Sequence, residues 1–323
     1  MIVSQWLNNV CFRMAFPREI RIREVGVREG FQTLTQVVPT EKKLKLISAL
    51  NKTGVKDIEI CSFVRADKVP QMADAEEIVA GYERTPGVNY TGLYLNPAGF
   101  ERAEQSKRLD NQGWLYIAAS ETFLQKNNNC GIAEMLAKMP DWVASFKRFG
   151  KTPQALMISS AFGCHYEGKI GPDKVMSVIG PAMQLSEDLG SPLQEISLAD
   201  TTGLGTPISV KTLVRKVKKN YPYVTISLHL HDTYGSGLAN ACAGLEEGIG
   251  IFDASVGGMG GCPFANGAAG NICTEDLAFM CESMGIATGL NLSAYVEAAK
   301  LAQEIVGVQL PGKLFRTALV RAR

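Results

Sequence analysis

Eight short apolar runs, each followed by a helix-like pattern, constrain the fold of this chain more than any other feature. The runs lie at 19–27, 55–61, 88–94, 114–120, 154–160, 194–200, 225–231 and 251–257. The helical patterns lie at 41–53, 70–84, 97–108, 133–149, 173–189, 207–220, 237–249 and 275–285. Strict alternation of eight strand–helix units predicts an α/β protein built as a (β/α)₈ barrel.

A doubly wound open sheet is the alternative architecture, because the strand count could slip by one or two. No G-x-G-x-x-G follows the first run, which weakens a dinucleotide-binding version of that alternative. Residues 290–311 predict an extra C-terminal helical segment, and the tail "LFRTALVRAR" reads as a surface appendix. We therefore expect a single TIM-barrel catalytic domain at 18–323, preceded by an N-terminal extension at 1–17.

The charge balance limits the classes of partner. Lysine and arginine total 33 against 32 acidic residues, and no long block of like charge occurs, so nucleic acid and anionic membranes are not expected as partners. No apolar stretch reaches membrane-spanning length. Eight scattered cysteines without a C-x-x-C pair indicate reduced thiols, as in the cytoplasm or a compartment like the mitochondrial matrix.

The stretch "SLHLHDTYG" holds two of the chain's three histidines, His229 and His231. Residues two apart on a strand point to the same face, so the two imidazoles would project side by side and could hold one metal ion. A structural pair, satisfied by hydrogen bonds at the strand end, is the alternative.

Polar residues also lie at the ends of the apolar runs or just after them, and Glu59 lies within the second run. They are Arg28, Glu29, Gln32, Glu59, Ser62, Ser120, Glu121, Asp200, Thr201, Asp232, Cys262 and Asn271. Active sites of (β/α)₈ barrels lie at the carboxyl ends of the strands, so we expect these groups at one end of the barrel.

The ligand types indicate the metal. Two imidazoles, one carboxylate and an amide oxygen make a mixed nitrogen and oxygen site, which favours Mg²⁺ or Mn²⁺. Zn²⁺ remains open. So does ferrous iron, because two histidines and one carboxylate form the facial triad of non-haem oxygenases.

The segment 257–270 holds six glycines in fourteen residues, which predicts a mobile loop over the site. An irregular strand-to-helix turn is the alternative. Cys262 lies in this segment, where it could deliver or accept a proton when the loop closes.

Several long motifs resemble one family. They are "EVGVREGFQ", "IEICSFVRADKVPQMAD", "AASETFLQKNNNC", "GCHYEGKI", "SLADTTGLGTP", "HLHDTYGSGLAN" and "GGMGGCPFANGAAGNICTED". Together, from about residue 20 to 310 and in collinear order, they resemble the 3-hydroxy-3-methylglutaryl-CoA lyases. The wider superfamily couples a metal-binding barrel to aldol- and Claisen-type chemistry. "GGCP" followed by "GNICTED" is similar to the lyase branch rather than the synthases.

The resemblance implies a set of site residues. The implied ligands of a divalent cation are Glu29, His229, His231 and Asn271. The implied catalytic residues are Arg28 beside the thioester oxygen, Asp200 near the substrate hydroxyl, Cys262 as general acid, and Glu59 supporting the arginine and the metal shell. We expect Gln32, Ser62, Ser120 and Thr201 to contact an acyl-CoA substrate. A homodimer or higher homo-oligomer is the expected assembly.

Two positions depart from the family pattern. The family carries Arg-Asp where this chain has Arg28-Glu29, and one extra methylene moves a carboxylate by roughly 1.5 Å. His165 stands where the family usually has proline. Either the metal is reached by a different path, or the site is shaped for another substrate.

The implied reaction is cleavage of a 3-hydroxy-3-methylglutaryl-CoA-like acyl-CoA to acetyl-CoA and a keto acid, which is acetoacetate for the parent substrate. Asp200 and His231 are the candidate bases for the hydroxyl proton. A Claisen-type condensing synthase, a lyase for a different 3-hydroxyacyl-CoA and a non-catalytic binding barrel are the alternatives.

Overall fold

The computed structural model describes residues 16–262 and 265–321. Its main sheet has eight parallel strands in the order β3-β2-β1-β10-β9-β8-β5-β4. They are β1 (Arg21–Glu24), β2 (Asp57–Ser62), β3 (Asn89–Leu93), β4 (Gly113–Ala118), β5 (Pro153–Ser159), β8 (Glu195–Asp200), β9 (Thr225–Leu230) and β10 (Ile251–Ala254). Adjacent strands of this sheet are consecutive along the chain, and the last strand, β10, pairs with the first, β1. This order confirms the barrel and rules out the doubly wound alternative.

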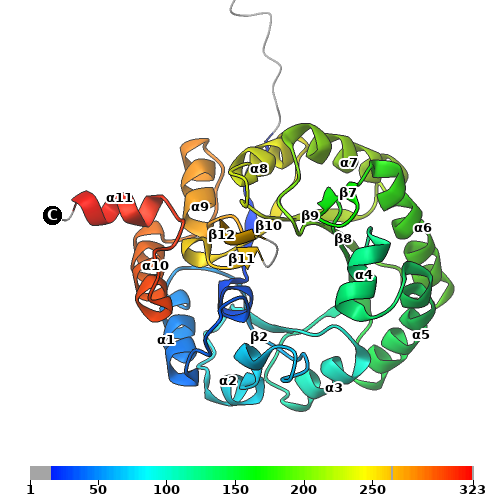
Figure 1. Cartoon of the computed structure of the whole chain (residues 1–323), viewed down its shortest axis with the longest axis horizontal. Helices are drawn as coiled ribbons and strands as arrows, with labels where there is room; N and C mark the ends of the chain where they lie inside the picture. Colours follow the sequence, from blue (N-terminus) through cyan, green and yellow to red (C-terminus); the bar gives the residue numbers. More distant parts are fainter. Residues whose placement is uncertain (1–15, 263–264, 322–323) are drawn as a thin grey trace, which may run out of the picture.

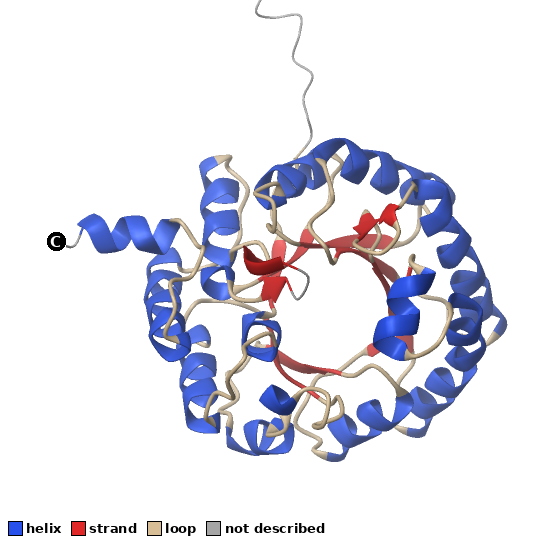
Figure 2. Ribbon diagram, viewed as in Figure 1, coloured by secondary structure: helices blue, strands red, loops and turns tan. Residues whose placement is uncertain are grey.

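Helices surround the strands as an outer ring (Figures 1 and 2). They are α1 (Thr40–Leu50), α2 (Ala75–Gly81), α3 (Pro97–Gln105), α5 (Ile132–Arg148), α6 (Pro172–Asp188), α7 (Pro207–Asn220), α8 (Gly237–Glu246) and α9 (Thr274–Ser283). The strands carry near-continuous buried runs because both faces of a parallel sheet are covered. Helix α7 starts where the sequence signals it, with a Thr206–Ser209 capping box and Pro207 in the first turn.

The seam between β3 and β4 is closed by side chains. The backbone N–H of Tyr90 donates to Asp110 Oδ2 at 2.9 Å, and that of Gly92 donates to Asn111 Oδ1 at 2.9 Å. The segment that leads into β4 therefore accepts hydrogen bonds from backbone N–H groups of β3. Within the described chain, β3 and β4 are not joined by backbone hydrogen bonds of a strand ladder.

Two predicted strands are shorter than expected. In the first predicted run, 19–27, the strand ends at Glu24. A π-helical turn, η1 (Gly26–Gly30), follows it. The last run ends its strand at Ala254, before the 3₁₀ turn η3 (Val256–Gly258). Within the described part of the glycine-rich segment, the strands β11 (Gly261–Cys262) and β12 (Ala265–Ala269) pair antiparallel, so the segment predicted as a mobile loop contains a hairpin.

The remaining elements lie outside the eight-fold repeat. They are the short 3₁₀ turn η2 (Pro70–Met72), α4 (Glu121–Asn128), the hairpin β6 (Gly163–Cys164) and β7 (Gly168–Lys169), α10 (Leu292–Val306) and α11 (Leu314–Arg321). Helix α10 confirms the extra C-terminal segment. The tail is more than a surface appendix, because Phe315 at the start of α11 is fully buried. None of the helices in the described chain combines the length and apolarity needed to span a bilayer.

Candidate metal centre and active site

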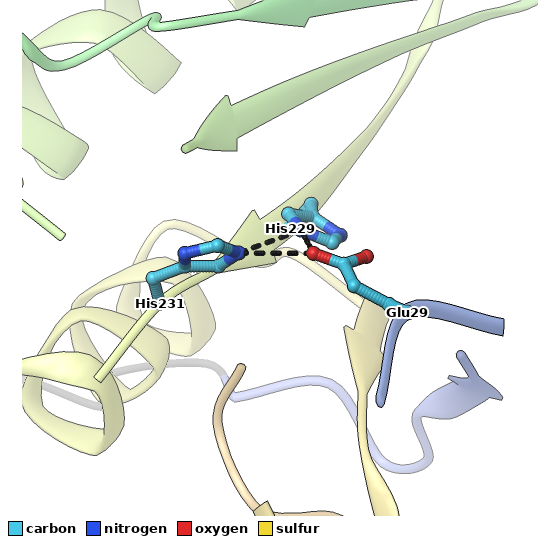
Figure 3. A group of neighbouring side chains, drawn as sticks. All are labelled: Glu29, His229 and His231. Carbon is cyan, nitrogen blue, oxygen red and sulfur yellow. Dashed lines mark hydrogen bonds and ion pairs between the residues drawn. The ribbon is translucent and has the colours of Figure 1, made fainter. Parts of the chain in front are cut away.

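Three potential ligands converge at the carboxyl ends of β1 and β9 (Figure 3). His229 Nε2 lies 3.2 Å from His231 Nε2. Glu29 Oε1 lies 3.3 Å from His231 Nε2 and 3.6 Å from His229 Nε2. Three ligand atoms this close can bind a common cation, as the H-x-H spacing on a strand predicts.

The π-helical turn η1 delivers Glu29 to this point, and both histidines are buried. Burial works against the charged form of Glu29, but Arg28 and His229 hold its pKa well below the ordinary value. Burial lowers the pKa of His229, yet Glu29 and Asp253 raise it to about 10. The carboxylates therefore draw positive charge to this position, which suits a cation.

Asn271 supplies a fourth potential ligand. Its backbone bridges that of His231, and its side-chain amide donates to Met259 O at 3.3 Å. The Oδ1 atom of Asn271 is buried and has no hydrogen-bond partner among the described residues. A Cβ added at Gly260 would lie 2.8 Å from Asn271 Nδ2 and 3.8 Å from Glu29 Cγ, so Asn271 and Glu29 flank the same glycine. Two imidazoles and two oxygen donors fit a divalent cation.

Arg28 lies between two carboxylates. Its Nε donates to Glu59 Oε1 at 2.5 Å, and its Nη2 lies 3.0 Å from Glu29 Oε2. Burial alone would lower the pKa of Arg28, but Glu59 and Glu29 raise it. Burial raises the pKa of Glu59, and Arg28 opposes that shift. The guanidinium is therefore fixed in direction and charged, as electrostatic stabilisation of a growing negative charge requires.

Asp200 ends β8 and is fully buried. Its Oδ2 accepts from the backbone N–H of Gly205 at 3.0 Å, whereas Oδ1 has no partner within the described structure. Burial raises the pKa of Asp200 to about 6. A carboxylate with one free oxygen and a pKa near neutrality has the properties of a proton acceptor.

The four residues expected at the substrate divide into two pairs. Ser62 Oγ and Gln32 Oε1 are buried without a partner in the part of the chain described. Ser120 instead caps α4 by accepting from Phe123 N at 3.1 Å. Thr201 accepts from the backbone N–H of Ser160 at 2.9 Å. Ser62 and Gln32 therefore have polar atoms that are free to bind a ligand. The hydroxyls of Ser120 and Thr201 already accept hydrogen bonds from backbone N–H groups.

Two other residues of interest are less defined. The backbone of Cys262 forms part of β11, but its side chain lies outside the described residues. His165 is half-buried in the turn between β6 and β7.

Sequence reasoning missed Asp253. This residue is 4% exposed, and its Oδ2 lies 3.1 Å from His229 Nδ1. The available signal was an acid in the middle of the apolar run "IFDASV", which occurs in a barrel strand only when its charge is compensated.

Comparison with known proteins decides the family, since the HMGL-like family model matches residues 19–302. The chain belongs to the HMGL-like family. It is 41% identical to the mitochondrial hydroxymethylglutaryl-CoA lyase of Bos taurus, over 88% of this chain and 84% of that protein. It is also 41% identical to the cytoplasmic 3-hydroxy-3-methylglutaryl-CoA lyase of Mus musculus, over 88% of this chain and 80% of that protein.

Solved structures of the same family superpose closely. The HMG-CoA lyase of Bacillus subtilis matches with a TM-score of 0.87 and 34% identity, covering 94% of this chain and 99% of that one. An HMG-CoA lyase from Acinetobacter baumannii, solved with coenzyme A and 3-methylmalate, matches with a TM-score of 0.83 and 36% identity, covering 93% and 95%. The predicted family resemblance is confirmed.

Proposed function

We propose that this protein is a divalent-metal-dependent carbon–carbon lyase that cleaves a 3-hydroxy-3-methylglutaryl-CoA-like thioester. The products are acetyl-CoA and a keto acid, which is acetoacetate for the parent substrate. The observation that carries the proposal is the convergence of Glu29, His229 and His231 at the carboxyl end of a barrel of this family. The binding of coenzyme A by a solved relative supports an acyl-CoA substrate.

Glu29, His229, His231 and the free Oδ1 of Asn271 would hold the cation. Mg²⁺ or Mn²⁺ suits these nitrogen and oxygen donors, and Zn²⁺ is a further candidate. A bound divalent cation supplies Lewis-acid polarisation of the substrate's hydroxyl and neighbouring oxygen. The protein's own contribution is to bind the substrate, orient it and move two protons.

The free Oδ1 of Asp200 would take the proton of the substrate hydroxyl. The hydroxyl oxygen then forms a carbonyl as the adjacent carbon–carbon bond breaks, and the electron pair of that bond passes to the thioester as an enolate. Arg28, held by Glu59, would stabilise the negative charge on the thioester oxygen. The Cys262 thiol would protonate the enolate carbon and release acetyl-CoA.

Gln32 and Ser62 would contact the substrate through their free oxygens, and Ser120 and Thr201 would shape the pocket through the backbone they hold. We further propose a homo-oligomer of this chain in the cytoplasm or a matrix-like compartment, where acyl-CoA thioesters and reduced cysteines occur together.

The deciding experiment is a panel of 3-hydroxyacyl-CoA thioesters, assayed by product mass with Mg²⁺ or Mn²⁺ and with a chelator. We expect metal-dependent release of acetyl-CoA together with a keto acid. When the enzyme is instead given an acyl-CoA and a keto acid, release of free coenzyme A would identify a condensing synthase. No turnover of any thioester, despite bound metal, would identify a non-catalytic barrel.

One observation favours a lyase with a different β-substituent on its substrate. Glu29 is one methylene longer than the aspartate of the family, and its Oε2 pairs with Arg28 at 3.0 Å. The longer side chain of Glu29 therefore sets where its carboxylate and the paired guanidinium of Arg28 lie. Their position changes the space left for the substrate.

A further inference from the structure

The two histidines differ in what lies behind them. The Nδ1 atom of His229 lies 3.1 Å from Asp253 Oδ2, on the side of the ring away from Glu29. The Nδ1 atom of His231 has no hydrogen-bond partner among the described residues. Among the described residues, only His229 therefore has a carboxylate at its Nδ1 atom.

Asp253 also faces a cation of the neighbouring strand β1, although its Oδ1 has no hydrogen-bond partner among the described residues. Its Oδ1 lies 3.9 Å from Arg23 Nε, and Arg23 pairs with Glu195. Ser227 Oγ donates to the same Glu195 carboxylate at 2.6 Å, and the guanidinium of Arg23 lies 5.1 Å from the centroid of the Trp114 ring. The cation of Arg23 compensates the buried carboxylate of Asp253 as well as the half-buried one of Glu195, so Asp253 can face His229 as an acceptor.

Arg23, Glu195, Trp114 and Asp253 line a cavity of about 430 Å³ inside the barrel. Its walls run from Asp57, at the start of β2, to Arg28 and Glu59 beside the metal centre. The interiors of (β/α)₈ barrels are usually filled by layers of branched apolar side chains. Here charged side chains lie among the apolar ones, and one of them, Asp253, contacts a ligand histidine from within the barrel.

We propose that Asp253 is a positioning residue that sets the affinity of the centre for its cation. By accepting the Nδ1 proton of His229, Asp253 fixes the tautomer that leaves the Nε2 lone pair directed toward His231 and Glu29. It also fixes the rotation of the ring. The inference rests on the proposed metal centre and adds a residue to which neither the motifs nor the family assignment gives a role.

Asp253→Asn tests the inference with little change in volume. The amide can turn its NH₂ toward Nδ1, which then must accept, and the ring proton moves to Nε2, where it blocks a cation. Partners of this kind typically change metal affinity by about 10- to 100-fold. We expect a loss of that size when Mn²⁺ binding to the metal-stripped full-length protein is measured by titration.

Asp57→Asn is the matched control. Asp57 lines the same cavity and pairs with Arg21, but it lies at the opposite end of the strands from His229. Because the same charge is removed without touching the ligand ring, we expect Mn²⁺ affinity within about threefold of wild type, well below the change expected from loss of a direct partner. Equal losses in the two variants would make the effect a general property of cavity charge and overturn the inference.

The ring tautomer gives a second readout, which a loss of packing would not produce. With only three histidines in the chain, ¹⁵N-detected correlation spectra can resolve the nitrogens of His229. In the Mg²⁺-saturated wild type we expect the proton on Nδ1, and in Asp253→Asn we expect that signal to be lost or shifted. If Asp253→Asn does not fold, Asp253→Ser, with a smaller acceptor, is measured in its place with the same expectation.

The failures are distinguishable. A wild type that binds no Mn²⁺ would overturn the metal centre and this inference with it. A wild type that binds Mn²⁺, with Asp253→Asn binding equally well and an unchanged His229 tautomer, would overturn the positioning role alone.

Discussion

The Nε2 atoms of His229 and His231 lie 3.2 Å apart at the end of β9. Two ring nitrogens at this distance repel each other unless a proton or a cation lies between or beside their lone pairs. Glu29 Oε1, 3.3 Å from His231 Nε2, adds negative charge at the same point. Positive charge at this point removes the repulsion between the two ring nitrogens and attracts the carboxylate. The strand spacing of the two histidines is therefore connected to metal binding.

His229→Ala and His231→Ala should each lower bound metal strongly while leaving the barrel folded. Each substitution removes one of the three converging ligand atoms without removing a strand from the sheet. Metal content after dialysis and far-ultraviolet circular dichroism measure the two effects. Full metal occupancy and activity in either variant would show that the histidine is a structural residue.

Much of this site could be predicted from the sequence, because parallel strands place their carboxyl-terminal residues together. Asp200, His229 and His231 follow from strand position alone. The π-helical turn that carries Glu29 could not be predicted, since it depends on contacts made after folding. One such contact is Glu24 Oε1, which accepts from both Gly26 N and Val256 N.

The sequence shows an acid at Asp253 but does not show where this acid points or which cation compensates it. A strand of four residues at β10 offers too few positions to show that its acid faces the barrel interior. The compensating cation, Arg23, comes from the first strand and becomes a neighbour only when β1 pairs with β10. Charge compensation between segments about 230 residues apart has no signal in a single sequence.

Cys262→Ser should reduce turnover by about 10²-fold or more, because general acid–base groups typically contribute that much, while metal binding stays near normal. The hydroxyl is a far weaker acid than the thiol, and Cys262 belongs to the hairpin β11–β12 rather than to the converging ligands. Steady-state kinetics and Mn²⁺ titration on one preparation make the comparison. Parallel losses of turnover and metal would assign Cys262 a structural role instead.

Glu275 should make the protein less stable as pH rises toward 8. Burial raises its pKa to about 8 from an ordinary value of 4.5. The folded state therefore binds a proton that the unfolded chain has already released, so the stabilisation present below pH 4.5 is lost as pH rises through the folded pKa. Since one pKa unit corresponds to about 1.4 kcal/mol, the effect is on the order of a few kcal/mol.

Glu275→Gln provides the check on that pH dependence. Glutamine keeps an acceptor for the backbone N–H of Gly257, which Glu275 binds at 3.1 Å, but it cannot ionise. We expect Tm to fall less in this variant than in the wild type between pH 5 and 8. Parallel Tm curves would mean that Glu275 does not titrate in this range.

Glu29→Asp should change which substrate the enzyme prefers. Shortening the side chain withdraws the carboxylate by roughly 1.5 Å from the two histidines and from Arg28, with which it now pairs at 3.0 Å. If the longer side chain marks a site shaped for another β-substituent, the variant should gain relative preference for the methylglutaryl thioester. The half-buried His165, in place of the usual family proline, adds a second departure in a loop after β5.

The measurement is kcat/KM for the methylglutaryl thioester and for an analogue with a different β-substituent, in the wild type and in Glu29→Asp. The ratio of the two values is the discrimination in the transition state, so a moved preference appears directly in it. Metal content is measured in parallel, because a ligand gap filled by water would lower kcat/KM for both substrates together. A wild type that already cleaves the methylglutaryl thioester far better than the analogue would make Glu29 a tolerated ligand variant, with its extra methylene absorbed by the π-helical turn that carries it.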